Sequence, residues 1–432
     1  MSVSPYLVAF APPVFLFFAV STPLAGCGSS ASSAVALDGG TTDAMEIADA
    51  TTARPDTSHP DTPAADGGVD APSACTRAAA PADRARKVVV SHPFEGDAGA
   101  KSTAFEVLDL AADGSLTRPS VPVTFRMGTA LDRPIVYTPD GEIGLVAQDD
   151  GSVGVFRLSA GKAPAVIHAA FKGPFSAQDV IMAPDGTHAY VLDPDTANNG
   201  GGVYDVAIGC DGTLTSRGLI LPGSGNALAL LPTDPTKAVL GGIAGDSPLG
   251  QDAHLVDLAT PMRIGSAAPF PDGGALVASV AVTPDGKYAL LADNGLNAGS
   301  RVAVVALAPQ LSGVSVLPTP FPAAVVMSPF GNAAIVLNDD STNQIHVLKY
   351  DPAKPTAPFV ITGEVAYKFG KPQLPTNASV LTRGALKGRV FVAENLAVRQ
   401  LTFGAAGGVT DTAKLGFPDT IETIVGVVGV QP

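Results

Sequence analysis

A short turn motif recurs along this chain about every fifty residues. The clearest copies are Pro-Asp-Gly at residues 139–141, 184–186 and 284–286, each between two short apolar runs. Proline fixes φ at the second position of a tight turn and glycine accepts a positive φ, so this pattern predicts a β-hairpin. Weaker copies of the motif are Leu231-Pro232-Thr233-Asp234, Ser328-Pro329-Phe330-Gly331 and Thr382-Arg383-Gly384.

Each predicted hairpin is followed by two further apolar runs before the next turn, which gives four antiparallel strands per repeat. Four strands in roughly 45–55 residues is the period of one blade of a β-propeller. By this count, complete blades begin near residues 134, 179, 227, 278, 323 and 378.

The two ends of the chain predict a seventh blade. Three strands precede residue 134, at Lys87–Ser91, Ala104–Leu110 and Val121–Phe125, and one apolar strand, Thr423–Val430, follows the last complete blade. Pairing the C-terminal strand with the first blade would leave no open sheet edge. We therefore expect an all-β fold, a seven-bladed β-propeller of four-stranded antiparallel blades whose ring is closed by the C-terminal strand.

Two repeats carry a more specific resemblance. Pro184-Asp185-Gly186 is followed by Tyr190-Val191-Leu192-Asp193, and Pro284-Asp285-Gly286 by Tyr288-Ala289-Leu290-Leu291-Ala292-Asp293. Over residues 87–430 the chain resembles the YVTN or lactonase-like propeller family, which implies seven blades and, as one activity of that family, lactone hydrolysis. The absence of Trp argues against the WD40, kelch and quinoprotein types.

The N-terminus predicts export. Residues 1–26 contain an apolar stretch that ends in Leu24-Ala25-Gly26 before Cys27, and this resembles a bacterial lipoprotein signal in which Cys27 becomes the acylated N-terminus. No Lys or Arg precedes the apolar stretch, unlike the usual signal. A plain secretory signal and an uncleaved anchor are the alternatives, and all three would export the protein.

Residues 27–86 are rich in Ala, Asp, Thr and Pro and lack apolar periodicity, so we expect a disordered tether. Half of the net charge of −14 falls between Gly28 and Cys75, where eight acids oppose Arg54. Residues 87–430 form the predicted propeller domain. Its mildly acidic balance offers no basic stripe for a phosphate backbone, which argues against nucleic-acid binding.

Polar residues recur at the predicted end of the second strand of six blades, where they would surround the mouth of the central channel. The positions are His92, Gln148, Asp193, Asp293, Asn338 and Glu394, with Gly241 in the remaining blade. Such a ring could bind a sugar or lactone by hydrogen bonds, or Ca²⁺ through Asp193, Asp293 and Asp339. The alternative is that Asp and Asn at strand ends only cap the loops that follow. No other cofactor is predicted.

For catalysis the candidates are His92, Glu394 and Arg133. His92 could act as a general base near neutral pH, and Arg133 could hold a carboxylate with two hydrogen bonds or form a surface ion pair. The sequence contains no Gly-x-Ser-x-Gly elbow, zinc-type Cys/His spacing or Gly-rich phosphate loop.

Cys75 and Cys210 remain after lipidation of Cys27, and an exported protein encounters an oxidising compartment. Both residues are expected on the face that carries the Pro-Asp-Gly turns, so a disulfide would pin the tether to the third blade. Two unpaired thiols are the alternative.

These patterns favour an exported, lipid-anchored propeller that acts as a binding or scaffold module at the cell envelope, facing the periplasm or the cell surface. Its partners would be an envelope protein or a small polar ligand, together with the bilayer that holds Cys27, and we expect a monomer. The alternative is a lactonase-like hydrolase with its site at the channel mouth.

Overall fold

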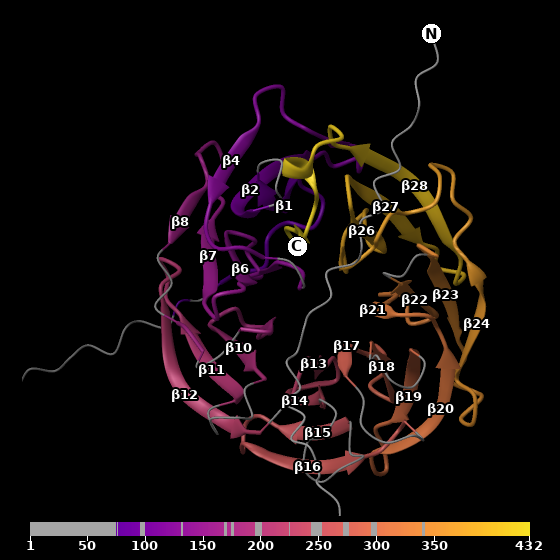
Figure 1. The fold of residues 1–432 in the computed structure, drawn as a ribbon. Helices are drawn as coiled ribbons and strands as arrows, with labels where there is room; N and C mark the ends of the chain where they lie inside the picture. The colour runs from indigo at the N-terminus through magenta and orange to yellow at the C-terminus, as the bar shows by residue number, and fades with distance from the viewer. Residues whose placement is uncertain are drawn as a thin grey trace, which may run out of the picture. The chain divides into compact units, whose positions relative to one another are not determined.

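The computed structural model describes residues 75, 77–95, 100–130, 133–167, 171–173, 177–194, 201–223, 225–242, 253–270, 276–294, 300–338 and 342–432. All of them belong to one compact unit. Seven antiparallel sheets are arranged in a ring, as predicted (Figure 1). No helix among these residues is long and apolar enough to cross a membrane.

Blade 1 joins the two ends of the described chain. It contains β29 (Val428–Val430), β1 (Arg86–Glu95), β2 (Ala100–Leu110) and the short strands β3 (Leu116–Thr117) and β4 (Val123–Arg126), both paired with β2. Blades 2 to 4 contain β5 (Val136–Tyr137), β6 (Ile143–Ala147), β7 (Val153–Arg157) and β8 (Ala165–Ile167); β9 (Asp179–Met182), β10 (His188–Asp193), β11 (Gly202–Ile208) and β12 (Leu214–Pro222); and β13 (Ala227–Leu231), β14 (Asp234–Gly241), β15 (Ala253–Asp257) and β16 (Met262–Ala267).

Blades 5 to 7 repeat the same order of four strands. They contain β17 (Val277–Val282), β18 (Tyr288–Asp293), β19 (Arg301–Ala306) and β20 (Ser312–Pro318); β21 (Pro322–Met327), β22 (Ala333–Asn338), β23 (Ile345–Tyr350) and β24 (Phe359–Glu364); and β25 (Ala378–Val380), β26 (Arg389–Glu394), β27 (Ala397–Phe403) and β28 (Val409–Gly416). The predicted starts of the six complete blades agree with the structure to within two residues.

The recurring turn joins the first and second strands of a blade, and its hydrogen bonds and glycine conformation are those expected for a tight turn. In blade 2 the amide of Gly141 donates to the carbonyl of Thr138 at 2.7 Å, and Gly141 adopts φ +73°. The carboxylate of Asp140 accepts from the amide of Glu142 at 2.9 Å. All such turns lie on one side of the ring, which we call the turn face. The second strands end on the opposite side, the strand-end face.

The ring closes through β29, which pairs with β1 over Val88↔Val430, Val89↔Gly429 and Val90↔Val428. Closure by the C-terminal strand is therefore confirmed, but the strand is shorter than predicted. The strand was expected to begin at Thr423, but Thr423 is the last residue of the 3₁₀ turn η1 (Ile421–Thr423) and β29 begins at Val428. The amide of Val428 donates to the side chain of Asn377 at 3.1 Å, which joins blade 1 to blade 7.

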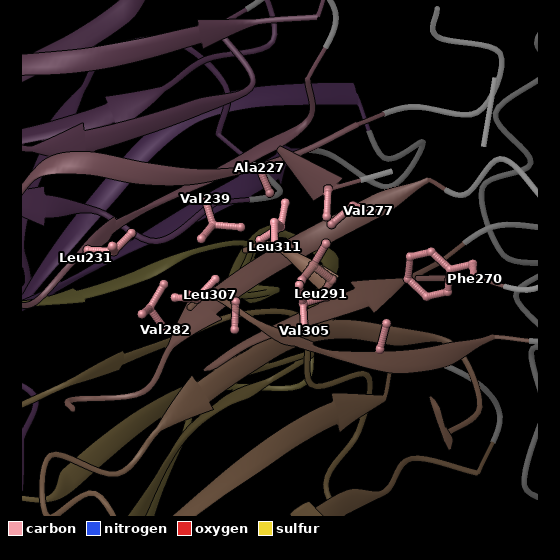
Figure 2. Packing of buried hydrophobic residues seen from close by; sticks show 13 residues of the cluster. Ala227, Leu231, Val239, Phe270, Val277, Val282, Leu291, Val305, Leu307 and Leu311 are labelled. Atoms are coloured by element: carbon pink, nitrogen blue, oxygen red, sulfur yellow. The ribbon is translucent and has the colours of Figure 1, made fainter. Parts of the chain in front are cut away.

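The hydrophobic core lies between neighbouring blades. Figure 2 shows one cluster, in which Ala227, Leu231 and Val239 of blade 4 pack against Val277 and Leu291 of blade 5. Similar clusters join other neighbouring blades. Because the middle of each blade is buried on both sheet faces, second strands such as β18 and β22 are nearly continuous apolar runs.

Residues 77–85 form a segment, here called the strap, that packs on the turn face before β1. The sequence predicted a tether as far as residue 86, but ordered contacts begin earlier because the strap finds specific partners. A disulfide joins Cys75 to Cys210 in the β11–β12 turn. The guanidinium of Arg77 is almost fully buried and bonds Asp140 at 2.9 Å, and the carboxylate of Asp83 accepts from the amide of Ala385 in blade 7 at 2.6 Å.

Candidate functional site

The six polar residues expected around the channel mouth do lie at the ends of second strands, on the strand-end face, but their side chains are buried. Their exposed fractions are at most 6%, and those of Asp193 and Asn338 are zero. Burial of a charged or polar group requires compensating bonds. The contacts of each side chain therefore determine what it can do.

In four blades the partner of the strand-end residue comes from the same blade. Gln148 accepts from the hydroxyl of Ser152 at 2.7 Å. Asp293 pairs with Arg301 at 3.3 Å. Two further pairs of this kind are Asn338 with His346 at 3.4 Å and Glu394 with Arg399. These side chains stabilise the second-to-third strand connections of their blades.

Glu394 belongs to the most deeply buried charge cluster of the described residues. Arg399 is fully buried and bonds both Glu394 and Asp411, while Lys414 lies 3.0 Å from the second oxygen of Glu394. The guanidinium also lies 5.6 Å from the ring centroid of Tyr367. Arg399 and Asp411 were not predicted as site residues, although a charged residue at an inward-facing position of an alternating strand was the available signal.

His92 is held from two sides. Its Nδ1 lies 3.1 Å from the carbonyl oxygen of Ile424 and its Nε2 lies 3.3 Å from Glu106. Arg118 donates two hydrogen bonds to the same carboxylate, at 2.5 and 3.0 Å. Burial alone would raise the pKa of Glu106, but the bonds from His92 and Arg118 outweigh it and lower the pKa below its usual value. Glu106 thus stays ionised between two donors.

Arg133 lies at the strand-end mouth of the central channel and reaches across it. Its guanidinium donates to the carbonyl oxygens of Gln178 at 3.3 Å and Asn226 at 2.8 Å, and also to that of Ala278. These acceptors belong to the entries of blades 3, 4 and 5. Arg133 therefore joins four blades at the channel mouth. All three acceptors are backbone carbonyl oxygens.

The channel behind Arg133 contains a cavity of about 370 Å³. Its walls are mostly apolar residues of the inner strands, and its polar lining residues are Arg133, Asp179, Ser279 and Asn377. Burial raises the pKa of Asp179, and the charge of Arg133 offsets part of this effect. A small ligand in the channel would meet one cation, one carboxyl group and a hydrophobic wall.

The described residues contain no group of three or more His, Cys, Asp or Glu side chains that could hold a metal ion. Two members of the Ca²⁺ set, Asp193 and Asp293, lie in blades 3 and 5, and the third, Asp339, is outside the described residues. The same holds for Cys27, the predicted lipidation site. The candidate site residues as a set remain a prediction.

Neither a scan against protein-family models nor a search of curated proteins finds a match for this sequence. Solved structures do match. The periplasmic gluconolactonase of Pseudomonas aeruginosa has a TM-score of 0.59 and 14% identity over 81% of this chain and 99% of its own. A candidate 6-phosphogluconolactonase of Bacteroides fragilis has a TM-score of 0.57 and 13% identity over 81% of this chain and 98% of its own.

The fold is not confined to proteins described as lactonases. The β-propeller domain of Cps50 (Swd1) from Myceliophteria thermophila has a TM-score of 0.50 and 12% identity over 70% of this chain and 91% of its own. At such identities the likeness establishes the fold alone. The chain is a seven-bladed propeller with lactonase-like structural neighbours.

Proposed function

We propose that this chain is an exported, lipid-anchored β-propeller that acts as a binding or scaffold module at the cell envelope. The observation that carries the proposal is the engagement of the predicted catalytic groups. Both ring nitrogens of His92 have partners, and Glu394 is buried against Arg399 and Lys414. A general base must reach a proton of its substrate, and these two side chains are instead built into the frame of their blades.

Lipid anchoring follows from the predicted signal and is tested separately. A Cys27→Ser variant of the full chain should leave the membrane fraction for the soluble one and lose incorporation of a labelled fatty acid. Equal fractionation of the two chains, with no label in either, would contradict the anchor. It would leave the binding proposal intact.

A lactonase-like hydrolase is the second candidate, because one observation favours it. The channel cavity places Arg133 and Asp179 at its mouth, and a gluconolactonase is among the structural neighbours. In this alternative the guanidinium would orient the lactone carbonyl and Asp179 would assist the attacking water. A carboxyl group whose pKa is raised by burial, with a cation beside it, is of the kind that such chemistry uses.

The Cys27→Ser chain separates the two candidates. It is incubated with glucono-δ-lactone and with 6-phosphogluconolactone, with and without Ca²⁺, and acid release is followed against the spontaneous rate. The binding-module proposal expects no excess over that rate. Turnover that survives purification and falls at least tenfold in Asp179→Asn would overturn it in favour of the hydrolase.

A further inference from the structure

A loop on the strand-end face carries two of the exposed large apolar side chains of the described residues. Residues 365–377 connect β24 of blade 6 to β25 of blade 7. Phe369 is 45% exposed and Leu374 is 46% exposed. Phe321, in the connection from blade 5 to blade 6, is 41% exposed on the same face. Exposed apolar side chains gathered on one face are typical of interaction sites.

The loop is held in place by hydrogen bonds from three side chains, of which Asp411 and Arg399 are buried. The carboxylate of Asp411 accepts from the amides of Lys368 and Phe369, at 2.9 and 3.2 Å. Arg399 donates to the carbonyl oxygen of Gly370 at 2.8 Å. The side chain of Asn343, from the β22–β23 loop, accepts from the amide of Leu374 at 2.8 Å. The charge cluster that contains Glu394 thus positions the backbone that presents Phe369.

Backbone strain occurs in this loop and in two other connections on the strand-end face. The described residues include three non-glycine residues with positive φ, and these are Phe321 at +38°, Asn343 at +51° and Leu374 at +48°. Bulky residues rarely adopt this region, and such strain persists only where surrounding contacts impose it, often at ligand clamps. Two of the three are the exposed Phe321 and Leu374. The fold therefore maintains strain at the places where apolar side chains meet solvent.

Charge identifies the chemistry of the partner. Residues 365–377 contain Lys368 and Lys371 and no Asp or Glu, in a chain with a net charge of −14. Both lysines are exposed. A negatively charged segment that also carries apolar residues would complement the two cations, Phe369 and Leu374. Because the loop is already ordered, little conformational entropy would be lost on its side of the interface.

An anionic bilayer fits this surface less well than a protein segment does. A bilayer is flat and would meet the strand-end face broadly, including the exposed acids Asp419 and Glu422 in the connection from β28 to β29. A narrow segment can contact the loop alone, because exposed charges that it does not contact are screened at physiological salt.

We propose that the 365–377 loop is an interaction surface for an acidic, partly apolar segment of a partner protein. This inference rests on the proposed binding function and adds to it the surface and the chemistry of the partner. Lys368 and Lys371 would pair with carboxylates, while Phe369 and Leu374 would be covered by apolar side chains. The Arg399–Asp411 pair would act as a positioning element.

Site-specific photocrosslinking tests the proposal with the full chain in cells that produce it. A photoreactive phenylalanine analogue is placed at position 369 in the loop, at 419 elsewhere on the strand-end face, and at 360 on the outer strand of blade 6. Val360 is 46% exposed, which matches Phe369. We expect a protein adduct at 369 that is at least fivefold more abundant than at 360, on a segment with more acids than bases.

Charge reversal supplies the second arm. The double variant Lys368→Glu with Lys371→Glu should reduce the adduct at 369 at least tenfold. The control double variant, Lys162→Glu with Lys354→Glu, makes the same change in net charge at exposed positions on the turn face and should leave the adduct at 369 unchanged. Unchanged circular dichroism in both double variants excludes unfolding as the cause.

The outcomes separate this inference from the broader proposal. Protein adducts at 419 but none at 369, lipid adducts at 369, or an adduct at 369 that is indifferent to charge reversal would overturn the inference and leave the binding module standing. If no position gives a protein adduct, both fall.

Discussion

The turn face and the strand-end face of this propeller hold their polar side chains in different ways. On the turn face, aspartates bond backbone amides and hydroxyls within a few residues, as Asp140 and Asp285 do, and the strap and its disulfide lie across this side. On the strand-end face, charged groups are buried and paired with partners that differ from blade to blade. The repeated motif thus builds one face, while blade-specific pairs build the other.

This difference has a functional meaning. A repeated local turn needs only its own residues, so the same turn can serve most blades. Buried pairs such as Arg399 with Asp411 involve a particular third and fourth strand, and Asp411 also orders the 365–377 loop that leads into blade 7. The strand-end face is therefore where this propeller departs from its own repeat, and departures of this kind are expected at functional surfaces.

The strongest test of the comparison removes the buried cation of blade 7. Arg399→Met leaves the carboxylate of Asp411 buried without its cation, so we expect a loss of about 3–5 kcal/mol in the free energy of unfolding, measured by urea denaturation. Arg217→Met is the control, because Arg217 is half exposed and pairs with Asp205 at 3.2 Å, a surface pair worth about 0–1 kcal/mol. If Arg399→Met and Arg217→Met lost the same free energy of unfolding, the buried pairs of the strand-end face would be no more stabilising than a surface pair.

Removing the covalent link of the turn face should have the next largest effect. Cys75→Ser with Cys210→Ser opens a link between residues 135 positions apart in sequence, and we expect a loss of about 2–4 kcal/mol from the greater freedom of the unfolded chain. The wild-type chain denatured in reductant is the matched control and should reach the same value. A double variant as stable as the oxidised wild type would mean that the other strap contacts suffice.

A glycine pair tests the turn motif itself. Gly186 has φ +68°, and a Cβ there would lie 2.3 Å from the ring of Pro139 in the neighbouring blade. Gly161 has φ +70° with open space around it. Gly161→Ala should cost about 1 kcal/mol for the backbone conformation alone, and Gly186→Ala should cost about 2–3 kcal/mol because the two blades must also separate. Thermal and urea unfolding measure the loss of stability in each variant. Equal losses in Gly161→Ala and Gly186→Ala would show that the contact between Gly186 and Pro139 adds nothing to the cost.

The smallest effect is a difference in pH dependence between the faces. Burial raises the pKa of Asp179 in the channel, so the folded state loses stability as pH rises from the unfolded pKa through the folded one. Asp179→Asn should therefore gain stability relative to wild type at pH 7 and match it at low pH.

On the turn face the sign is reversed. Burial alone would raise the pKa of Asp285, but bonds from Thr283, Tyr350 and Lys287 outweigh it and lower the pKa. The stability that this carboxylate contributes is complete above its unfolded pKa and is lost as pH falls through the folded value. Asp285→Asn should be less stable than wild type at pH 7 and approach it in acid. Urea titrations at several pH values that gave both variants the same sign would contradict the comparison.

The periodic parts of the fold could be predicted from sequence because they rest on local chemistry. Pro-Asp-Gly or a weaker copy of it between apolar runs indicated the position of the inner hairpin in blades 2 to 7, and the unequal numbers of strands at the two ends implied closure by the C-terminal strand. The start of that strand was predicted too early, at Thr423 instead of Val428. Apolar composition does not distinguish a strand from the turn that leads into it.

The partners of the strand-end residues could not be predicted in the same way. Glu394 was found by its place in the repeat, but its contact with Arg399 depends on which way two side chains turn within the blade. The strap was missed for a related reason. Arg77 lies in a stretch of low-complexity composition, and only the three-dimensional ring brings Asp140 of blade 2 beside it.

The Cys75–Cys210 disulfide determines where a mechanical load would enter the propeller. The seam of the ring, β29 with β1, has three residue pairs, whereas β11 and β12 share seven. A pull on the chain before Cys75 would pass through the disulfide to the turn between β11 and β12 without first peeling β1 from β29. The disulfide thus directs force away from the short ladder that closes the ring, which would suit the proposed attachment to a surface through the N-terminal segment.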